Sequence, residues 1–221
     1  LLVSEFNLVT LPEDVPFEIG ALVGCGVSTG VGAVVNTAAV TPGSSVVVIG
    51  CGGVGLSAVQ AARAATDGTV LAVDPVASKR ELAVRLGATR AVAPEELAAV
   101  AAEQPGGGFD YAIEAVGAAA TIRAAYDAVR RGGTAVIAGV GPKDSEVTFS
   151  PYELYAGERR LVGSVFGSTD IRRDFPRVIQ LWRDGVLDLE GIISARVPLD
   201  ELPAALDRLR SGDVLRTVVV F

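Results

Sequence analysis

Segment Gly50–Gly55 (GCGGVG) constrains the fold of this chain more than any other feature of its sequence. It follows the apolar run Val46–Ile49 and leads into the alanine-rich run Val54–Ala65. Four consecutive apolar residues are typical of a short strand buried on both faces of a parallel sheet, and alanine favours a helix. The pattern G-x-G-x-x-G at this place therefore predicts a strand–turn–helix unit whose helix N-terminus can bind phosphate.

The residues of this unit have separate tasks if it binds a dinucleotide. Gly50 permits the tight turn, Gly52 lets the backbone approach a pyrophosphate, and Gly55 lets the helix pack closely on the strand. Asp74 ends the next predicted strand, where a carboxylate can accept hydrogen bonds from both ribose hydroxyls. Its charge would repel a 2′-phosphate, which favours NAD over NADP. Two alternatives stay open: a surface aspartate that begins a turn, and a methyltransferase of similar topology.

From Ser45 onward the chain alternates strand-like and helix-like segments. The predicted strands are Val46–Ile49, Thr69–Val73, Arg90–Ala93, Phe109–Ala115, Thr134–Ala138 and Arg160–Phe166. The predicted helices between them are Val54–Ala65, Ala77–Leu86, Glu95–Glu103 and Ala118–Arg130. This alternation predicts an α/β fold with a doubly wound, six-stranded parallel Rossmann sheet.

Both ends of the chain lie outside this alternation. Leu1–Gly20 is predicted to be irregular with short strands, and the segment Glu146–Phe149 interrupts the fifth crossover. After Gly167 the sequence predicts a helix over Ile171–Asp184, a strand over Ile192–Val197, a helix over Asp200–Leu209 and a final strand over Leu215–Phe221.

Charge and cysteine content exclude several classes of function. The net charge is -7 and the sequence pI is near 4.7, so we expect neither a nucleic acid nor an anionic membrane as partner. No charge occurs between Glu18 and Arg63, a stretch long enough to span a bilayer. Its glycines and polar residues, and the break at residues 41–43, favour a buried core instead. Two cysteines and no secretion signal predict a cytoplasmic protein.

Longer segments of the chain closely resemble the zinc-containing alcohol dehydrogenases of the medium-chain dehydrogenase/reductase superfamily. These segments are 22–63 (LVGCGVSTGVGAVVNTAAVTPGSSVVVIGCGGVGLSAVQAAR), 72–89 (AVDPVASKRELAVRLGAT), 136–140 (VIAGV), 162–167 (VGSVFG) and 209–221 (LRSGDVLRTVVVF). The resemblance implies a cofactor domain over residues 27–167, inserted in a mostly β, GroES-like catalytic domain. Residues 1–26 and 168–221 would be parts of that catalytic domain. Because the chain starts at Leu1 and contains no Met, we expect a longer parent protein.

The resemblance also assigns roles to single residues. Cys25 corresponds to the third protein ligand of a catalytic zinc, and Thr29 lies against the nicotinamide. The other implied cofactor contacts are Gly50, Gly52, Gly53, Val54 and Gly55 for the pyrophosphate loop, Asp74 and Lys79 for the ribose, Val116 and Ala138 for the cleft, the backbone of Ala138, Ser164 and Phe166 for the carboxamide, and Arg216 for the pyrophosphate. A solvated arginine is the alternative for Arg216. The remaining zinc ligands and the proton relay would lie before Leu1.

The expected function is hydride transfer between an alcohol or aldehyde and NAD, with zinc in the full-length parent and an isolated chain that is inactive. A homodimer is expected through the sheet edge formed by Val147–Phe149 and Arg160–Phe166. Two alternatives remain: a zinc-independent quinone or enoyl reductase, against which Cys25 counts, and a non-catalytic NAD-binding or redox-sensing module.

Overall fold

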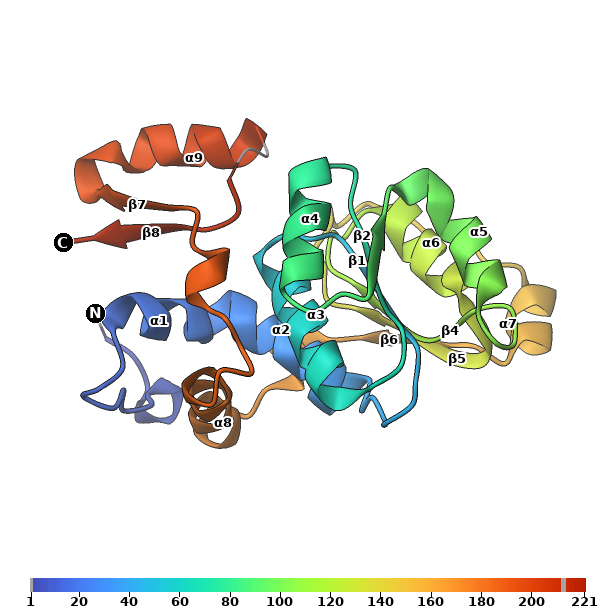
Figure 1. The fold of residues 1–221 in the computed structure, drawn as a ribbon, viewed down its shortest axis with the longest axis horizontal. Helices are drawn as coiled ribbons and strands as arrows, with labels where there is room; N and C mark the ends of the chain where they lie inside the picture. Colours follow the sequence, from blue (N-terminus) through green and yellow to red (C-terminus); the bar gives the residue numbers. More distant parts are fainter. Residues whose placement is uncertain (1, 212–213) are drawn as a thin grey trace.

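The computed structural model describes residues 2–211 and 214–221, and its larger body is a six-stranded parallel sheet flanked by helices (Figure 1). The strands are β1 (Val46–Ile49), β2 (Val70–Val73), β3 (Arg90–Val92), β4 (Phe109–Glu114), β5 (Val129–Ile137) and β6 (Arg160–Gly163). They are ordered β3-β2-β1-β4-β5-β6, which is the order of the Rossmann fold. The predicted doubly wound sheet is confirmed.

Helices cover both faces of this sheet because its strand residues alternate between two cores. Val46 and Val48 of β1 pack with α3 (Gly53–Ala65) and α4 (Ala77–Arg85) on one face. Val47 and Ile49 pack on the other face with residues of α5 (Leu97–Glu103) and α6 (Ala119–Ala128). Every residue of β1 is therefore buried, as the continuous apolar run predicted.

A helical segment from Phe17 to Thr37 joins the sheet to the rest of the molecule. It comprises α1 (Phe17–Leu22), π-helical turns at Val23–Val27 and Ala33–Thr37, and α2 (Ser28–Gly32) between them. The segment is long and apolar enough to cross a membrane, but 67% of its most apolar window is buried inside the protein. Such burial is typical of a core helix.

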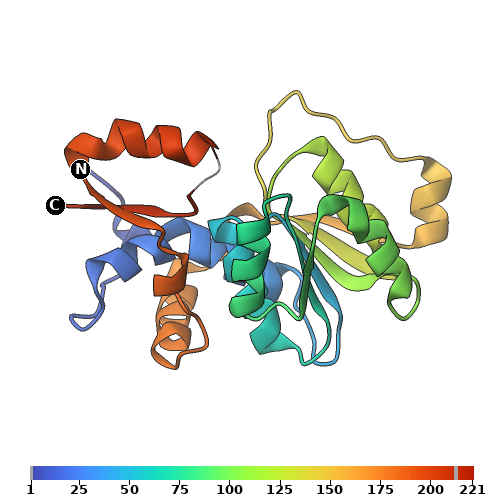
Figure 2. The ribbon, with the colours of Figure 1, turned by 45° about the horizontal axis from the view of Figure 1, so that its top comes forward.

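The smaller body gathers the two ends of the chain (Figures 1 and 2). Helix α8 (Ile171–Arg183) packs beside the Phe17–Thr37 segment. Strands β7 (Ala195–Pro198) and β8 (Thr217–Val220) form a separate parallel pair, with α9 (Leu202–Ser211) between them in the chain. Residues 212–213 of the last resembling segment lie outside the described residues.

Several predicted boundaries were wrong. Strand β6 ends at Gly163, and Val165–Ser168 forms a 3-10 turn instead of the end of a strand. Residues 2–20 contain a 3-10 turn and the beginning of α1, and no strand is described there. Helix α6 ends at Ala128, two residues before the predicted end at Arg130, because Val129 already pairs with Phe109 of β4. The register of this pairing then shifts before Thr134.

The connection from β5 to β6 also differs from its prediction. Residues 145–150 have no regular structure, so Val147–Phe149 is not a strand. A short helix that the sequence analysis missed, α7 (Pro151–Gly157), follows it. Its capping box was readable, since Ser150 precedes Pro151 and accepts a hydrogen bond from the Glu153 N–H.

Candidate functional site

A cavity of about 500 Å³ lies at the carboxyl ends of β1, β2 and β4. Neighbouring strands β1 and β4 mark the point where the strand order reverses, which is where ligands bind in open α/β sheets. The cavity is lined by Ile49, Gly50, Gly52, Val73, Asp74, Pro75, Lys79, Pro94, Leu97, Ala115, Val116, Ala120, Thr121 and Ala124. Most of these side chains are apolar, with polar groups from Asp74, Lys79 and Thr121.

The glycine turn at the N-terminal end of α3 is shaped by backbone contacts that leave no room for side chains at some of its positions. Gly50 has a φ of 93°, which an L side chain rarely adopts. A Cβ on Gly55 would overlap the Gly50 carbonyl, so the helix meets the strand at the closest possible distance. A Cβ on Gly52, by contrast, would meet nothing within 4 Å. Open space therefore lies over the backbone that would approach a phosphate.

Asp74 is held rigidly at the edge of this cavity, with 6% of its surface exposed. Its Oδ2 accepts a hydrogen bond from the Cys51 N–H at 2.8 Å, and its Oδ1 accepts one from the Val76 N–H at 2.9 Å. The Arg80 guanidinium donates to the carbonyls of Asp74 and Pro75 at 2.7 and 2.9 Å. Because each carboxylate oxygen has a second lone pair, Asp74 can still accept from two hydroxyl groups.

Cys51 lies inside the glycine turn but has no exposed surface. Burial, and then the charge of Asp74, raise the pKa of its thiol to about 12. The thiol therefore stays protonated at neutral pH, and a protonated buried thiol is neither a nucleophile nor a metal ligand.

Arg216 approaches the glycine turn from the other end of the sequence. A Cβ on Gly53 would overlap its guanidinium, and so would a Cβ on Gly26. Within the described part of the chain, this guanidinium has no hydrogen-bonding partner. Cys25, next to Gly26, is exposed and lies on a π-helical turn, a distortion that is frequent at functional sites.

The turn after β6 packs against the helix that carries Thr29. Phe166 and Ser168 have φ values of 54° and 50°, a left-handed conformation that costs about 1–3 kcal/mol per residue unless the surroundings enforce it. Here the Thr37 hydroxyl hydrogen-bonds the hydroxyls of Ser164 and Ser168, at 2.7 and 2.9 Å. A Cβ on Gly32 would overlap the Gly167 backbone. The strained turn is therefore fixed against the Ser28–Thr37 helix.

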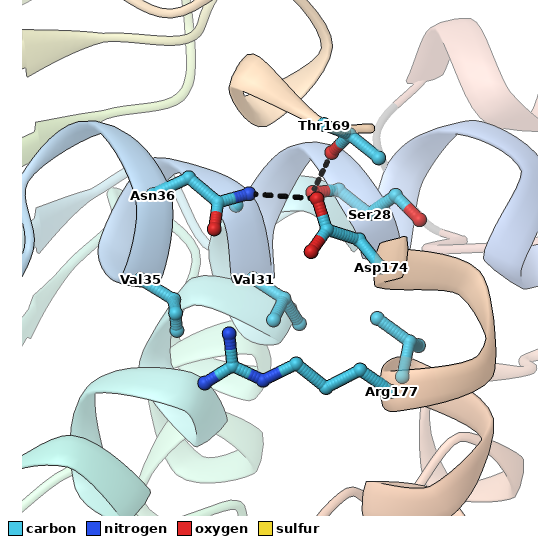
Figure 3. A pocket seen from close by; sticks show the side chains of 9 residues that line it. Ser28, Val31, Val35, Asn36, Thr169, Asp174 and Arg177 are labelled. Atoms are coloured by element: carbon cyan, nitrogen blue, oxygen red, sulfur yellow. Dashed lines mark hydrogen bonds between the residues drawn. The ribbon is translucent and has the colours of Figure 1, made fainter. Parts of the chain in front are cut away.

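Figure 3 shows how the same helix is joined to α8. Asn36 donates through Nδ2 to the Asp174 carboxylate at 3.1 Å and to the Gly167 carbonyl at 3.2 Å. The Thr169 hydroxyl donates to the Ser28 carbonyl at 3.4 Å. Asp174 is 5% exposed, and the Arg173 guanidinium, in spite of burial, lowers the pKa of its carboxyl.

The family described as Zinc-binding dehydrogenase matches residues 53–184, which is more than half of the chain. The chain belongs to this family. The match begins inside the glycine turn, at Gly53, and ends just after α8.

The relatives of the chain include an alcohol dehydrogenase class-2 isozyme 2 from Oryctolagus cuniculus, which is 37% identical over 99% of this chain and 59% of that protein. An S-(hydroxymethyl)glutathione dehydrogenase from Escherichia coli O1:K1 / APEC is 37% identical over 98% of this chain and 60% of its own length. The benzyl alcohol dehydrogenase structure from Acinetobacter calcoaceticus superposes with a TM-score of 0.92 at 32% identity, covering 97% of this chain and 60% of that one. The chain thus spans about 60% of the length of these relatives.

The structure divides the predicted site residues into two groups. One group lines the cavity: Gly50, Gly52, Asp74, Lys79 and Val116. The other group lies around the Ser28–Thr37 helix and the adjoining strand ends: Cys25, Thr29, Gly53, Ala138, Ser164, Phe166 and Arg216. Val54 and Gly55 belong to the first turn of α3, between the two groups.

The zinc set is incomplete in this chain. Cys25 is the one predicted ligand, the sequence contains no His, and no group of three or more Cys, Asp or Glu side chains that could hold a metal occurs among residues 2–211 and 214–221. A catalytic zinc needs three protein ligands. These residues alone therefore do not fit the metal.

Sequence reasoning missed Glu114. It lies at the carboxyl end of β4 with no exposed surface, and its carboxylate holds the loop that carries Val116. The signal was present, because a charged residue inside an apolar parallel strand has to find hydrogen-bond donors there.

Proposed function

We propose that this chain is the NAD-binding part of a zinc-dependent alcohol dehydrogenase, which transfers a hydride between an alcohol or aldehyde and NAD. The observation that carries the proposal is the buried Asp74 carboxylate beside the open backbone of Gly52, in one cavity. This cavity has the shape and chemistry that an adenosine diphosphate needs: an apolar slot, a ribose acceptor and a glycine turn at a helix N-terminus.

NAD would be held along the carboxyl ends of the strands. Asp74 and Lys79 would bind the ribose, the N–H groups at the start of α3 and Arg216 would bind the pyrophosphate, and Thr29 and the Ala138, Ser164 and Phe166 backbone would position the nicotinamide. When bound, the nicotinamide supplies the hydride acceptor. The turn at residues 164–168, which is fixed by the Thr37 hydroxyl, would hold the nicotinamide ring in one orientation.

The cofactor preference follows from Asp74 and is testable on the chain itself. One related structure, a zinc-binding dehydrogenase from Sinorhizobium meliloti 1021, is bound to NADP. It is 29% identical to this chain and superposes with a TM-score of 0.83, covering 95% of this chain and 61% of that one. The proposal therefore needs a direct comparison. Calorimetric titration should show tighter binding of NAD than of NADP, because the carboxylate repels a 2′-phosphate. Equal affinities would contradict the role given to Asp74.

Zinc would be held in the full-length protein with Cys25 as one ligand. An exposed thiol on a π-helical turn is open to ligands from another segment. We expect no stoichiometric zinc on the 221-residue chain at neutral pH, and a zinc content in the longer protein that Cys25→Ala abolishes. Metal analysis of both proteins measures this. A zinc-free, active parent would support a zinc-independent reductase instead.

The proposed protein is a cytoplasmic homodimer that continues its sheet through β6. Strand β6 is the edge strand, all four of its residues are exposed, and Leu161 and Val162 present apolar side chains there. An unpaired apolar edge is a template for another strand. Light scattering should show a dimer that Leu161→Lys dissociates, while Val84→Lys, on the exposed face of α4, leaves it intact. A monomer at high protein concentration would contradict this.

A further inference from the structure

Glu114 places a carboxylate where the protein gives it an unusual set of donors. Its Oε1 accepts hydrogen bonds from the Val116 N–H at 2.8 Å, the Gly117 N–H at 2.7 Å and the Thr121 hydroxyl at 2.7 Å. Its Oε2 is buried and, within the described residues, has no partner. One oxygen therefore fixes both the loop after β4 and the first turn of α6, close to the positive end of that helix.

The backbone of Glu114 holds a second loop. Its carbonyl accepts hydrogen bonds from the N–H groups of Ala138 at 2.8 Å and Gly139 at 3.0 Å, where β5 ends. The two loops also touch directly, since a Cβ on Gly139 would overlap the Gly117 backbone. Glu114 therefore joins the loops after β4 and β5 into one unit.

This unit forms part of the cavity wall. Val116 and Thr121, both positioned by Oε1, line the cavity together with Asp74. The Val116 side chain lies so close to Gly50 that a Cβ on that glycine would meet its Cγ2 at 2.5 Å. A shift of the Val116–Gly117 loop would therefore change both the cavity and the space beside the glycine turn.

We propose that Glu114 is a positioning residue for cofactor binding: its Oε1 holds Val116 and Thr121 as the wall against which the adenosine half of the dinucleotide packs. The proposal rests on the proposed NAD binding. It predicts that the acceptor oxygen of Glu114 contributes more to cofactor binding than its negative charge does. A glutamine at position 114 keeps an acceptor oxygen in the place of Oε1 and has its amide nitrogen in the place of Oε2, which has no partner among the described residues.

The test is calorimetric titration of the 221-residue chain with AMP and with NAD. Glu114→Ala should weaken both ligands by at least about tenfold, because it leaves two N–H groups without an acceptor and frees the loop. Glu114→Gln should bind both within about threefold of the unmodified chain. Equal weakening of AMP and NAD would place the defect at the adenosine half. If Glu114→Ala is insoluble, Glu114→Asp replaces it, since a shorter carboxylate cannot reach all three donors.

Asp110 supplies a matched control at the opposite end of β4. It accepts hydrogen bonds from the Ser45 N–H and hydroxyl and from Arg130, at 2.7–2.9 Å, away from the cavity. Asp110→Ala should lower thermal stability without changing AMP affinity, which separates positioning from general destabilisation. Folded Glu114→Ala or Glu114→Asp with unchanged affinity, or Glu114→Gln as weak as Glu114→Ala, would overturn the inference alone. An unmodified chain that binds neither nucleotide would overturn the proposed function and this inference with it.

Discussion

The ribose corner, made by Gly50–Gly55 and Asp74, is built differently from the helical junction, where Ser28–Thr37 meets residues 164–174. In the ribose corner the side-chain hydrogen bonds of Asp74 join two consecutive strand–turn units, because its carboxylate accepts from the Cys51 N–H and the Val76 N–H. At the junction the contacts join distant parts of the chain. Thr37 and Ser164, 127 residues apart, share a hydrogen bond, and Asn36 reaches Asp174, 138 residues away.

Under the proposed function, this difference determines which part of the chemistry the 221-residue chain can perform. In the ribose corner both Asp74 and Cys51 are buried. The junction side leaves Cys25 exposed and the Arg216 guanidinium without a partner among the described residues. Cofactor binding should therefore survive in this chain, whereas the zinc and substrate chemistry should not.

The two cysteines allow the largest test of this comparison. At neutral pH a thiol-specific reagent should modify Cys25 quickly and Cys51 extremely slowly, because a pKa near 12 instead of 9.0 lowers the thiolate fraction about a thousandfold. Burial slows Cys51 further. Native and denatured samples of Cys25→Ser and Cys51→Ser should show this with a chromogenic disulfide. The Cys25→Ser variant keeps Cys51 as its thiol. Rapid modification of this variant in its native state would mean that the ribose corner opens in solution and exposes Cys51.

A smaller effect is expected from the carboxylate of the ribose corner. Asp74→Ser should weaken NAD about ten- to a hundredfold, since it removes charge-assisted hydrogen bonds worth about 1.5–3 kcal/mol. NADP should lose less than NAD, because the repulsion of its 2′-phosphate disappears as well. Calorimetry with both cofactors measures the ratio. An unchanged ratio would show that Asp74 does not face the 2′ position.

Arg80 limits how far that variant can be improved. Its guanidinium would have to give up its bonds to the Asp74 and Pro75 carbonyls before it could pair with a phosphate. Comparing Asp74→Ser with the double variant Asp74→Ser, Arg80→Ala therefore isolates the contribution of Arg80 to NADP binding. If the two bind NADP equally, Arg80 stays on the backbone.

The sheet could be predicted from sequence because its signals are local. Val46–Ile49 is apolar throughout, and the glycines and Asp74 follow strands at the spacing that a Rossmann fold needs. The helix Phe17–Thr37 and the end of β6 could not be predicted this way. The glycines of the Phe17–Thr37 helix pack against Gly167 and α3. Phe166, just after β6, adopts a left-handed conformation because Thr37 and Gly32 hold the turn that contains it. Neither partner is near in sequence.

The site shows the same division. Asp74 and the glycines could be found from spacing, while Cys25, Thr29 and Arg216 were found by family resemblance, since nothing local in the sequence says what they approach. Glu114 was missed by both approaches, although its charge inside an apolar strand indicated that it needs hydrogen-bond donors, and those donors are Val116, Gly117 and Thr121 just after it.

The smallest predicted effect concerns the junction and its carboxylate. The Arg173 guanidinium lowers the pKa of Asp174 although burial opposes it, so the folded-state value lies below the unfolded one. The stability that the carboxylate provides is therefore complete above its unfolded pKa, near 3.8, and is lost as the pH falls through the folded pKa. Asp174→Asn should lower the melting temperature by about 2–4 °C at pH 7, for a cost of about 1 kcal/mol. The melting temperature of Asp174→Asn should also depend less on pH in acid than that of the unmodified chain, because the variant has no carboxylate to protonate at this position.

Neighbouring charges make a control necessary for this measurement. Asp170 and Arg177 lie beside Asp174, and Asp110 also has a lowered pKa, because hydrogen bonds from Ser45 and Arg130 outweigh its burial. Asp110→Asn should therefore weaken the acid dependence too, but without loosening α8. Hydrogen exchange separates the two variants: only Asp174→Asn should speed exchange in α8 and in residues 164–168. If exchange there is unchanged, the bond from Asn36 to Asp174 does not hold the junction together, and the strained turn at Phe166 is fixed by Thr37 and the glycine contacts alone.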